Sequence, residues 1–157
     1  MSALTIRLGA RHRRLTYATF ALLWTSGALW LAFHYFLRVE GDFGPEAHPL
    51  EVWWLRLHGL TAMLALVAVG SLATNHVRLA WKRGKNLGTG LPMLAMTAWL
   101  AVSGYALYYF ASEANEAWLP LTHWIAGLAV PLAGLVHVRQ GRRPPAHAMH
   151  RKPARST

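Results

Sequence analysis

The stretch that decides the fold is VWWLRLHGLTAMLALVAVGSLATNHV, residues 52–77, an apolar run with a histidine near each end. His58 and His76 are 18 positions apart, and at about 100° per residue both imidazoles point to the same face of a helix. At about 1.5 Å rise per residue the two rings lie roughly 27 Å apart, close to the ~30 Å hydrocarbon thickness of a bilayer. The stretch therefore predicts a transmembrane helix with a metal-competent side chain near each surface.

Three further apolar runs are also long enough to cross a membrane. We expect spans at about 15–37, 52–77, 91–110 and 118–138, within one domain over residues 15–138. The first run is too long for the apolar core of a signal peptide, and no A-x-A-like site follows it, so we expect it to be retained. The sequence thus predicts an all-α integral membrane four-helix bundle, in contact with membrane lipid.

The charges divide between the loops and predict the orientation. Of the 16 Lys and Arg residues, 4 lie in 1–14, 4 in 78–90 and 6 in 139–157, whereas all 6 acids lie in the 39–51 and 111–117 loops. By the positive-inside rule both termini are cytoplasmic, so spans two and four run in the same direction. We expect 1–14 to be a basic cytoplasmic N-terminus and 139–157 a basic, disordered cytoplasmic tail.

Composition excludes several classes of function. The chain has no cysteine, which excludes disulfides, thiolate zinc sites, iron–sulfur clusters and covalent c-type haem. The formal charge of +10 belongs to a chain that is 54% apolar, so we interpret the basic segments as orientation and lipid-headgroup signals and expect no nucleic-acid partner. Histidine is the only plentiful transition-metal ligand left.

The fourth span carries a second pair of histidines. His123 and His137 are 14 positions apart, which leaves about 40° from whole turns, so they also share a helix face. Because spans two and four are parallel, each offers one outer and one inner imidazole. The predicted pairing is His58 with His123 and His76 with His137, and these four are the predicted metal ligands.

The residues between the histidines favour haem. On the same face of span four lie Gly127, Val130 and Gly134, which with the alanines of span two leave little bulk where a macrocycle would pass. Bis-imidazole ligation suits electron transfer, because it leaves no open coordination position. Zinc fits less well, because its sites gather three or four ligands at one point. Two non-covalent haems b are therefore predicted, with Gly127 and Gly134 as cofactor-contacting residues.

Other assignments remain open. Small residues at this spacing also serve tight helix packing, and a membrane histidine can bridge helices by a hydrogen bond. The separations of 18 and 14 residues differ by roughly 6 Å of helical rise, so helix two must tilt or one outer ligand must differ. His34, near the outer end of span one, is the substitute: it can pair with His123 or His58, bridge helices, or belong to a quinone pocket.

Basic side chains at the span ends are candidates for haem propionates, Arg56 at the outer boundary and Arg78 at the inner one, with snorkelling to headgroups as the alternative. The remaining histidines fall in predicted extramembrane segments. We expect a solvated role for them: His12, His48, His147 and His150.

Four motifs carry a resemblance to a known family. They are LRLHG (55–59), NHVRLAWK (75–82), SGYALYYF (103–110) and LTHWIAGLAVPLAGLVHVR (121–139). With these motifs the chain resembles the small bacterial four-helix di-haem cytochromes b, the cytochrome b561-like group, over about residues 15–139. His123 and His137 match the family's ligands best. The usual pattern has a ligand early in span one on the cytoplasmic side, whereas this chain has two histidines in span two.

The resemblance implies a b-type cytochrome of the bacterial inner membrane. Such a protein moves electrons between the quinone pool and a partner redox protein, often a periplasmic c-type cytochrome or a dehydrogenase. We expect an electron-transfer subunit of an oxidoreductase complex rather than a complete enzyme, with a bound quinone as a further cofactor. Two alternatives are a stand-alone quinol-linked reductase of a small external acceptor and a haem-free membrane anchor.

Overall fold

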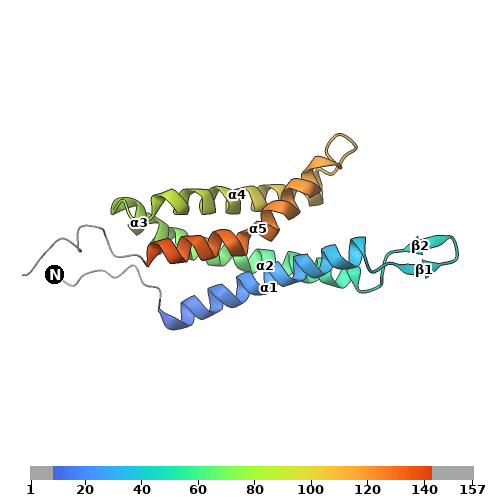
Figure 1. The fold of residues 1–157 in the computed structure, drawn as a ribbon, viewed down its shortest axis with the longest axis horizontal. Coiled ribbons are helices and arrows are strands. Elements are labelled where there is room, and N and C mark those ends of the chain that lie inside the picture. Colours follow the sequence, from blue (N-terminus) through green and yellow to red (C-terminus); the bar gives the residue numbers. More distant parts are fainter. Residues whose placement is uncertain (1–8, 143–157) are drawn as a thin grey trace, which may run out of the picture.

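A computed structural model describes residues 9–142, and these form an almost wholly helical structure (Figure 1). Four long helices are each apolar and long enough to cross a membrane. A short antiparallel hairpin pairs Val39 with Glu46 and Gly41 with Gly44. In chain order the elements are α1 (Ala10–Tyr35), β1 (Val39–Gly41), β2 (Gly44–Glu46), α2 (Glu51–Leu72), η1 (Ala73–Val77), α3 (Arg78–Lys82), α4 (Leu87–Tyr109) and α5 (Trp118–Gly141).

The long helices form two helical hairpins that face each other. Helix α1 packs along α2 and α4 packs along α5, whereas contacts between the hairpins are sparser and lie mainly between α1 and α5 (Figure 1). The β-hairpin extends from one end of the bundle, and α3 lies at the other end. This arrangement confirms the predicted all-α four-helix membrane bundle.

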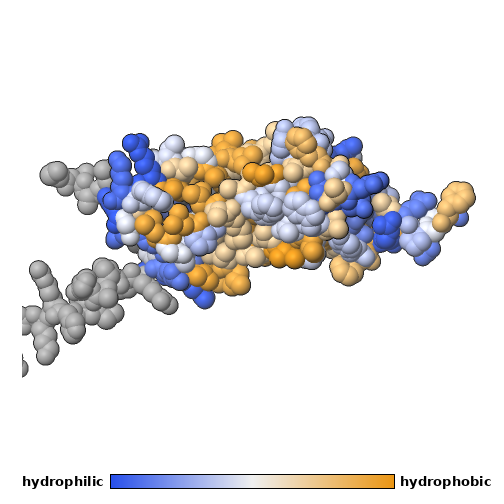
Figure 2. Space-filling model, turned by 90° about the horizontal axis from the view of Figure 1, so that it is seen from above, coloured by the Kyte–Doolittle hydropathy of each residue, from blue (hydrophilic) through white to orange (hydrophobic). Residues whose placement is uncertain are grey.

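The surface is that of a protein in lipid. Apolar residues cover much of the middle of the face in Figure 2, and hydrophilic residues gather at the two ends. Among the described residues only Ala65 and Leu119 are buried apolar side chains, and many large apolar side chains are exposed. An exposed apolar surface of this extent needs a nonaqueous surrounding, so the fold is that of a multi-pass membrane protein.

Hydroxyl side chains occupy the most buried positions. Ser26, Thr61 and Ser103 are each at most 1% exposed. Each hydroxyl donates to a backbone carbonyl of its own helix, as Ser103 Oγ does to Trp99 O at 2.7 Å. Small hydroxyl residues let membrane helices approach closely without leaving a polar group unpaired. The packing inside each helical hairpin therefore depends on small residues rather than on large apolar ones.

The helix bounds differ from the predicted ones at the basic end. Helix α1 begins at Ala10 rather than near residue 15, and the predicted 78–90 loop is shortened by α3 and by α4, which starts at Leu87. Asn86 precedes α4 in the left-handed conformation, φ 56°. Pro92 consequently lies inside α4 rather than in its first turn, and Gly88 supplies the carbonyl at i−4 that the proline ring meets.

Helix α2 continues into α3 through one π-helical segment, η1, which contains His76. A π turn takes in one extra residue with no matching gain in length. It therefore removes about 1.5 Å of the roughly 6 Å by which the two histidine spacings differ.

The two ends of the bundle differ in charge. The start of α1, the α3 segment and the end of α5 lie together at one end, and they carry Arg11, Arg78 and Arg139 (Figure 1). The β-hairpin and the 110–117 turn lie at the opposite end and hold five of the six acids, and the sixth, Glu51, begins α2 at that end. The predicted features of residues 1–8 and 143–157, including His147, His150 and most of the basic tail, lie outside the described residues.

Candidate functional site

Two histidine pairs connect the helical hairpins. The rings of His58 in α2 and His123 in α5 have their centres 6.4 Å apart, with planes at 85°. Toward the other end of the bundle, His76 in η1 and His137 in α5 have ring centres 6.1 Å apart, with planes at 81°. Along α5 the two pairs are about 21 Å apart. The structure thus brings together the same partners that the helix faces predict.

These separations suit a metal ion held between the two rings. A metal bound by imidazole nitrogen at about 2.0 Å on each side, with about 1.1 Å from that nitrogen to the ring centre, gives ring centres about 6.2 Å apart. Both observed values lie within 0.2 Å of this estimate. Aromatic rings in ordinary contact also have their centres about 4.5–7 Å apart, as Phe33 and Trp54 do at 6.3 Å, so the separation fits a bound metal without requiring one.

The hydrogen bonds of His58 indicate which of its nitrogens is protonated. His58 Nδ1 lies 3.0 Å from Leu23 O in α1. A carbonyl only accepts, so Nδ1 must be the donor. Ser26 Oγ lies 3.3 Å from the same nitrogen and donates its own proton to Leu23 O at 2.9 Å. In a neutral imidazole, Nε2 then carries the lone pair that a metal needs.

His123 has the same protonation, imposed by a hydroxyl. Ser103 Oγ lies 2.8 Å from His123 Nδ1 and donates its single proton to Trp99 O at 2.7 Å. The hydroxyl oxygen therefore accepts from His123 Nδ1–H. Ser103 is fully buried, so this contact is shielded from water.

The His137 ring is held by residues at the start of α4 and just before it. Thr89 Oγ1 donates to Asn86 Oδ1 at 2.9 Å and lies 3.0 Å from His137 Nδ1. Asn86 Nδ2, which only donates, lies 3.2 Å from the same nitrogen, so these contacts hold the ring in place without fixing its tautomer. Asn86 Nδ2 donates to His137 O at 3.1 Å, which holds the end of α5 against the loop. Three of the four histidines thus have Nδ1 in contact with α1 or α4, and in His58 and His123 this leaves Nε2 for a ligand, the arrangement that metal-binding histidines use.

Glycines make room for three of the rings. A Cβ on Gly27 of α1 would lie 2.8 Å from His58 Cε1, and one on Gly104 of α4 would lie 3.3 Å from His123 Cε1. At Gly90 the corresponding distance to His137 Cε1 is 3.6 Å. Any side chain at Gly27 would push the imidazole away, so this glycine is needed for the observed position of His58.

Between the two pairs, the predicted face of α5 is lined by small residues. Gly127, Val130 and Gly134 are half-buried, as are His123 and His137. A Cβ on Gly134 would meet no atom within 4 Å, and one on Gly127 would meet only Leu100 Cδ2 at 3.8 Å. The face that carries both histidines therefore has little bulk beside it.

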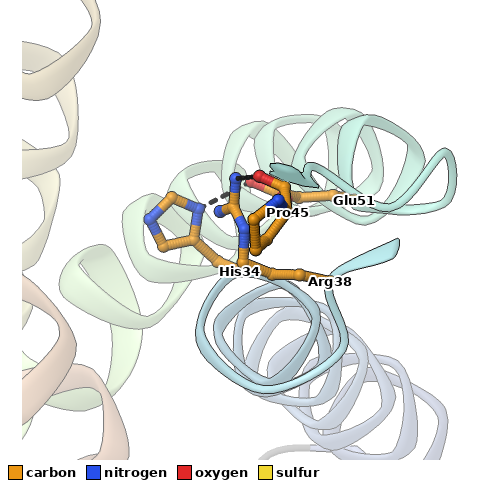
Figure 3. A network of polar contacts seen from close by, with 4 residues as sticks. All are labelled: His34, Arg38, Pro45 and Glu51. Atoms are coloured by element: carbon orange, nitrogen blue, oxygen red, sulfur yellow. Dashed lines mark hydrogen bonds and ion pairs between the residues drawn. The ribbon is translucent and has the colours of Figure 1, made fainter. Parts of the chain in front are cut away.

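The structure separates His34 from the histidine pairs. Its Nδ1 lies 2.7 Å from Glu51 Oε1 (Figure 3). Its ring also stacks on Trp30. It therefore bridges α1 and α2, which was one of the predicted alternatives. His12 lies within α1, and its Nε2 lies 3.1 Å from Ser71 Oγ. It therefore contacts α2, whereas the sequence predicted a solvated role. His48 Nδ1 accepts from Leu50 N at 3.1 Å.

The two candidate arginines lie at the surface. The Arg56 guanidinium lies over the Trp53 ring, 4.9 Å from its centre, and Arg78 is exposed at the start of α3. Residues that orient the imidazoles were not predicted from sequence: Leu23, Ser26, Gly27, Asn86, Thr89, Gly90, Ser103 and Gly104. Hydroxyls and glycines inside apolar helices were the available signal, but that signal does not say which histidine each one contacts.

The candidate metal ligands occur as two separate pairs of histidines. Within residues 9–142 no three His, Asp or Glu side chains gather around one point, so the ligand set of a structural zinc site is not formed there. Two separate pairs of imidazoles would instead suit metals whose other coordination positions are filled by a macrocycle. In comparisons with known proteins, no family model, curated protein or solved structure matches the chain.

Proposed function

We propose that this chain is a membrane b-type di-haem cytochrome that carries electrons across the bilayer. One observation supports this above all: two imidazole pairs lie between the helical hairpins at 6.4 and 6.1 Å, the separation of two rings on one iron. Three of the four rings also have Nδ1 in a hydrogen bond to a neighbouring helix. A packing histidine needs neither a facing imidazole nor an unused Nε2.

The residues present fit haem b at both positions. His58 and His123 would hold the outer group, and His76 and His137 the inner one, with Gly127 and Gly134 beside the macrocycles. Arg56 and Arg78 lie at the two ends of the bundle, where propionates would emerge. When bound, each haem supplies a one-electron centre whose potential is set by its axial ligands and by burial. The chain's own part is to orient the imidazoles and to exclude water.

Two such centres about 21 Å apart along α5 would form a path across the membrane. With the cytochrome b561-like motifs, this favours electron transfer between the quinone pool and a partner redox protein, such as a periplasmic c-type cytochrome or a dehydrogenase. The charge distribution favours the bacterial inner membrane with both termini cytoplasmic. The chain would then act as an electron-transfer subunit of an oxidoreductase complex.

The direct test is the spectrum of the purified protein. A reduced-minus-oxidised difference spectrum with pyridine haemochrome quantitation is expected to give haem b at about two per chain, because each bis-imidazole site takes one group. Protein that lacks a Soret band after expression with added haem precursor would contradict the proposal and favour a haem-free anchor.

The angle between the imidazole planes gives a second, independent prediction. With the imidazole planes at 85° and 81°, the two d orbitals of π symmetry on a bound iron would be nearly equal in energy, whereas parallel planes would split them. We therefore expect ferric electron paramagnetic resonance spectra of the strongly anisotropic low-spin type, with one dominant low-field feature. A conventional rhombic signal from both centres would mean that the ligand planes are parallel.

The Ser103 hydroxyl, which contacts His123 Nδ1, is expected to tune the midpoint potential of the outer haem. In Ser103→Ala, His123 Nδ1–H loses its acceptor, so the imidazole becomes a weaker electron donor and ferric iron is less stabilised. We expect an upward shift of one of two midpoint potentials in a spectroelectrochemical titration, and about tenfold weaker haem retention. Thr97→Ala is the matched control, because Thr97 also donates to a backbone carbonyl of α4, at 2.8 Å. Equal titrations for both variants would refute this role for Ser103.

A further inference from the structure

A second polar cluster lies at the outer end of the bundle, where α1 ends and α2 begins. His34 Nδ1 and Glu51 Oε1 are 2.7 Å apart, and the Arg38 guanidinium donates to Pro45 O at 3.1 Å, which ties the β-hairpin to α1 (Figure 3). The Glu51 side chain is only 14% exposed. The carboxylate and the imidazole thus form a hydrogen-bonded pair between α1 and α2 at the end of the bundle.

Two polar atoms beside this pair have no protein partner. Glu51 Oε2 and Trp54 Nε1 are both buried, and neither has a hydrogen-bond partner in the described part of the chain. They are three positions apart in α2 and so lie on the same side of the helix. One is an acceptor and the other a donor. Buried polar atoms are rarely left unpaired, so the two point to a ligand that offers both a hydroxyl and a carbonyl.

The surroundings of these atoms are aromatic. Trp30 stacks on His34 with planes 18° apart, and Phe33 lies 6.3 Å from Trp54 and 4.8 Å from His48, measured between ring centres. Aromatic side chains with a few placed polar groups are the usual lining for a flat cyclic ligand. The cluster therefore combines ring surfaces, a hydrogen-bond donor and a proton acceptor.

The cluster is aligned with the outer histidine pair. Glu51 precedes His58 by seven residues in α2, and His34 follows Gly27, which contacts His58, by seven residues in α1. Seven residues are about two turns, so the cluster lies on the same seam between α1 and α2, about 10 Å from the outer pair along the helix axes. A redox ligand bound here would face the outer end of the proposed electron path.

From this geometry we propose that the cluster is a quinone-binding site, in which Trp54 Nε1–H donates to a ring oxygen and Glu51, with His34, exchanges the proton of a ring hydroxyl. The inference rests on the proposed function for its redox partner. Oxidation of one quinol gives one quinone, two protons and two electrons. The protons would pass to the Glu51–His34 pair and leave at the acidic end, and the two electrons would go to two one-electron acceptors, which the haems of the proposed function would supply. Quinone reduction is the same step reversed.

The test uses purified holoprotein and decylubiquinone, with binding measured by calorimetry in one detergent. Trp54→Phe is expected to weaken binding about tenfold, because one hydrogen bond to a ring oxygen is lost. Glu51→Gln keeps the shape of the side chain, so this variant is expected to bind decylubiquinone within about threefold of the wild-type affinity. Trp81→Phe, an exposed tryptophan at the opposite end, is the matched control and binds as wild type.

A second measurement follows the proton. Reduction of the protein by decylubiquinol is expected to be about 100-fold slower in Glu51→Gln, because the general base is absent, while reduction by dithionite is unchanged. If both variants bind and react like wild type and only lose thermal stability, the cluster is an interhelical contact only, and the inference is wrong while the haem proposal stands. If wild type holds no haem, the proposed function fails, and the Trp54→Phe binding measurement alone decides the site.

Discussion

Replacing His123 with alanine is expected to lower the haem content of the purified protein to about half, with one of two spectral components lost. His123 faces His58 at 6.4 Å, and removal of one axial imidazole leaves a non-covalent haem with a single protein ligand. His137→Ala is expected to remove the other component, since its ring faces His76 at 6.1 Å. Pyridine haemochrome assays and redox titrations of the two variants measure the stoichiometry and show which potential disappears.

His34→Ala is the control for this experiment. His34 is also a half-buried membrane histidine, but it pairs with Glu51 rather than with another imidazole. We expect this variant to keep both haems. If His34→Ala lost one haem while His58→Ala kept both, the outer ligand assignment would be wrong, although the cytochrome proposal would remain.

Much of the fold follows from local properties of the sequence. Runs of apolar residues give the four spans, and the separation of acids from basic residues gives the ends at which the loops lie. The partner of each histidine also follows, because His123 and His137 both lie in α5, 14 residues apart, and each meets the predicted histidine although Pro131 lies between them. Haem binding by these histidines stays a prediction, since the distance between two imidazoles is not a measured metal bond.

Features that depend on tertiary packing were not predicted. The π-helical segment around His76 cannot be inferred from spacing, because a 100° rule assumes a regular α-helix throughout. The left-handed Asn86 follows from a packing requirement: its side chain holds the backbone carbonyl of His137, 51 positions away. The partners of His58 and His123 are likewise contributed by other helices, so only the assembled hairpins show why Ser26 and Ser103 are buried.

The smallest substitution with a large expected effect is Gly27→Ala. The added Cβ would lie 2.8 Å from His58 Cε1 and 2.9 Å from Nδ1, so the imidazole or helix α1 must move. Overpacking of this kind costs about 1–3 kcal/mol, and here the cost falls on the ring that faces His123. We therefore expect about 10-fold to 100-fold weaker retention of the outer haem, measured as haem loss to excess apomyoglobin, with the inner haem retained.

Gly70→Ala separates this steric effect from the general effect of removing a helix glycine. Gly70 lies in α2, and a Cβ there would meet no atom within 4 Å, so the substitution gains about 1 kcal/mol of helix propensity without a clash. This control is expected to retain both haems and to be at least as stable as wild type. The haem loss expected for Gly104→Ala lies between those of Gly27→Ala and Gly70→Ala, because its Cβ would be 3.3 Å from His123 Cε1. Equal haem loss from Gly27→Ala and Gly70→Ala would show that the position of the His58 ring does not depend on Gly27, and the outer pair would then need another explanation.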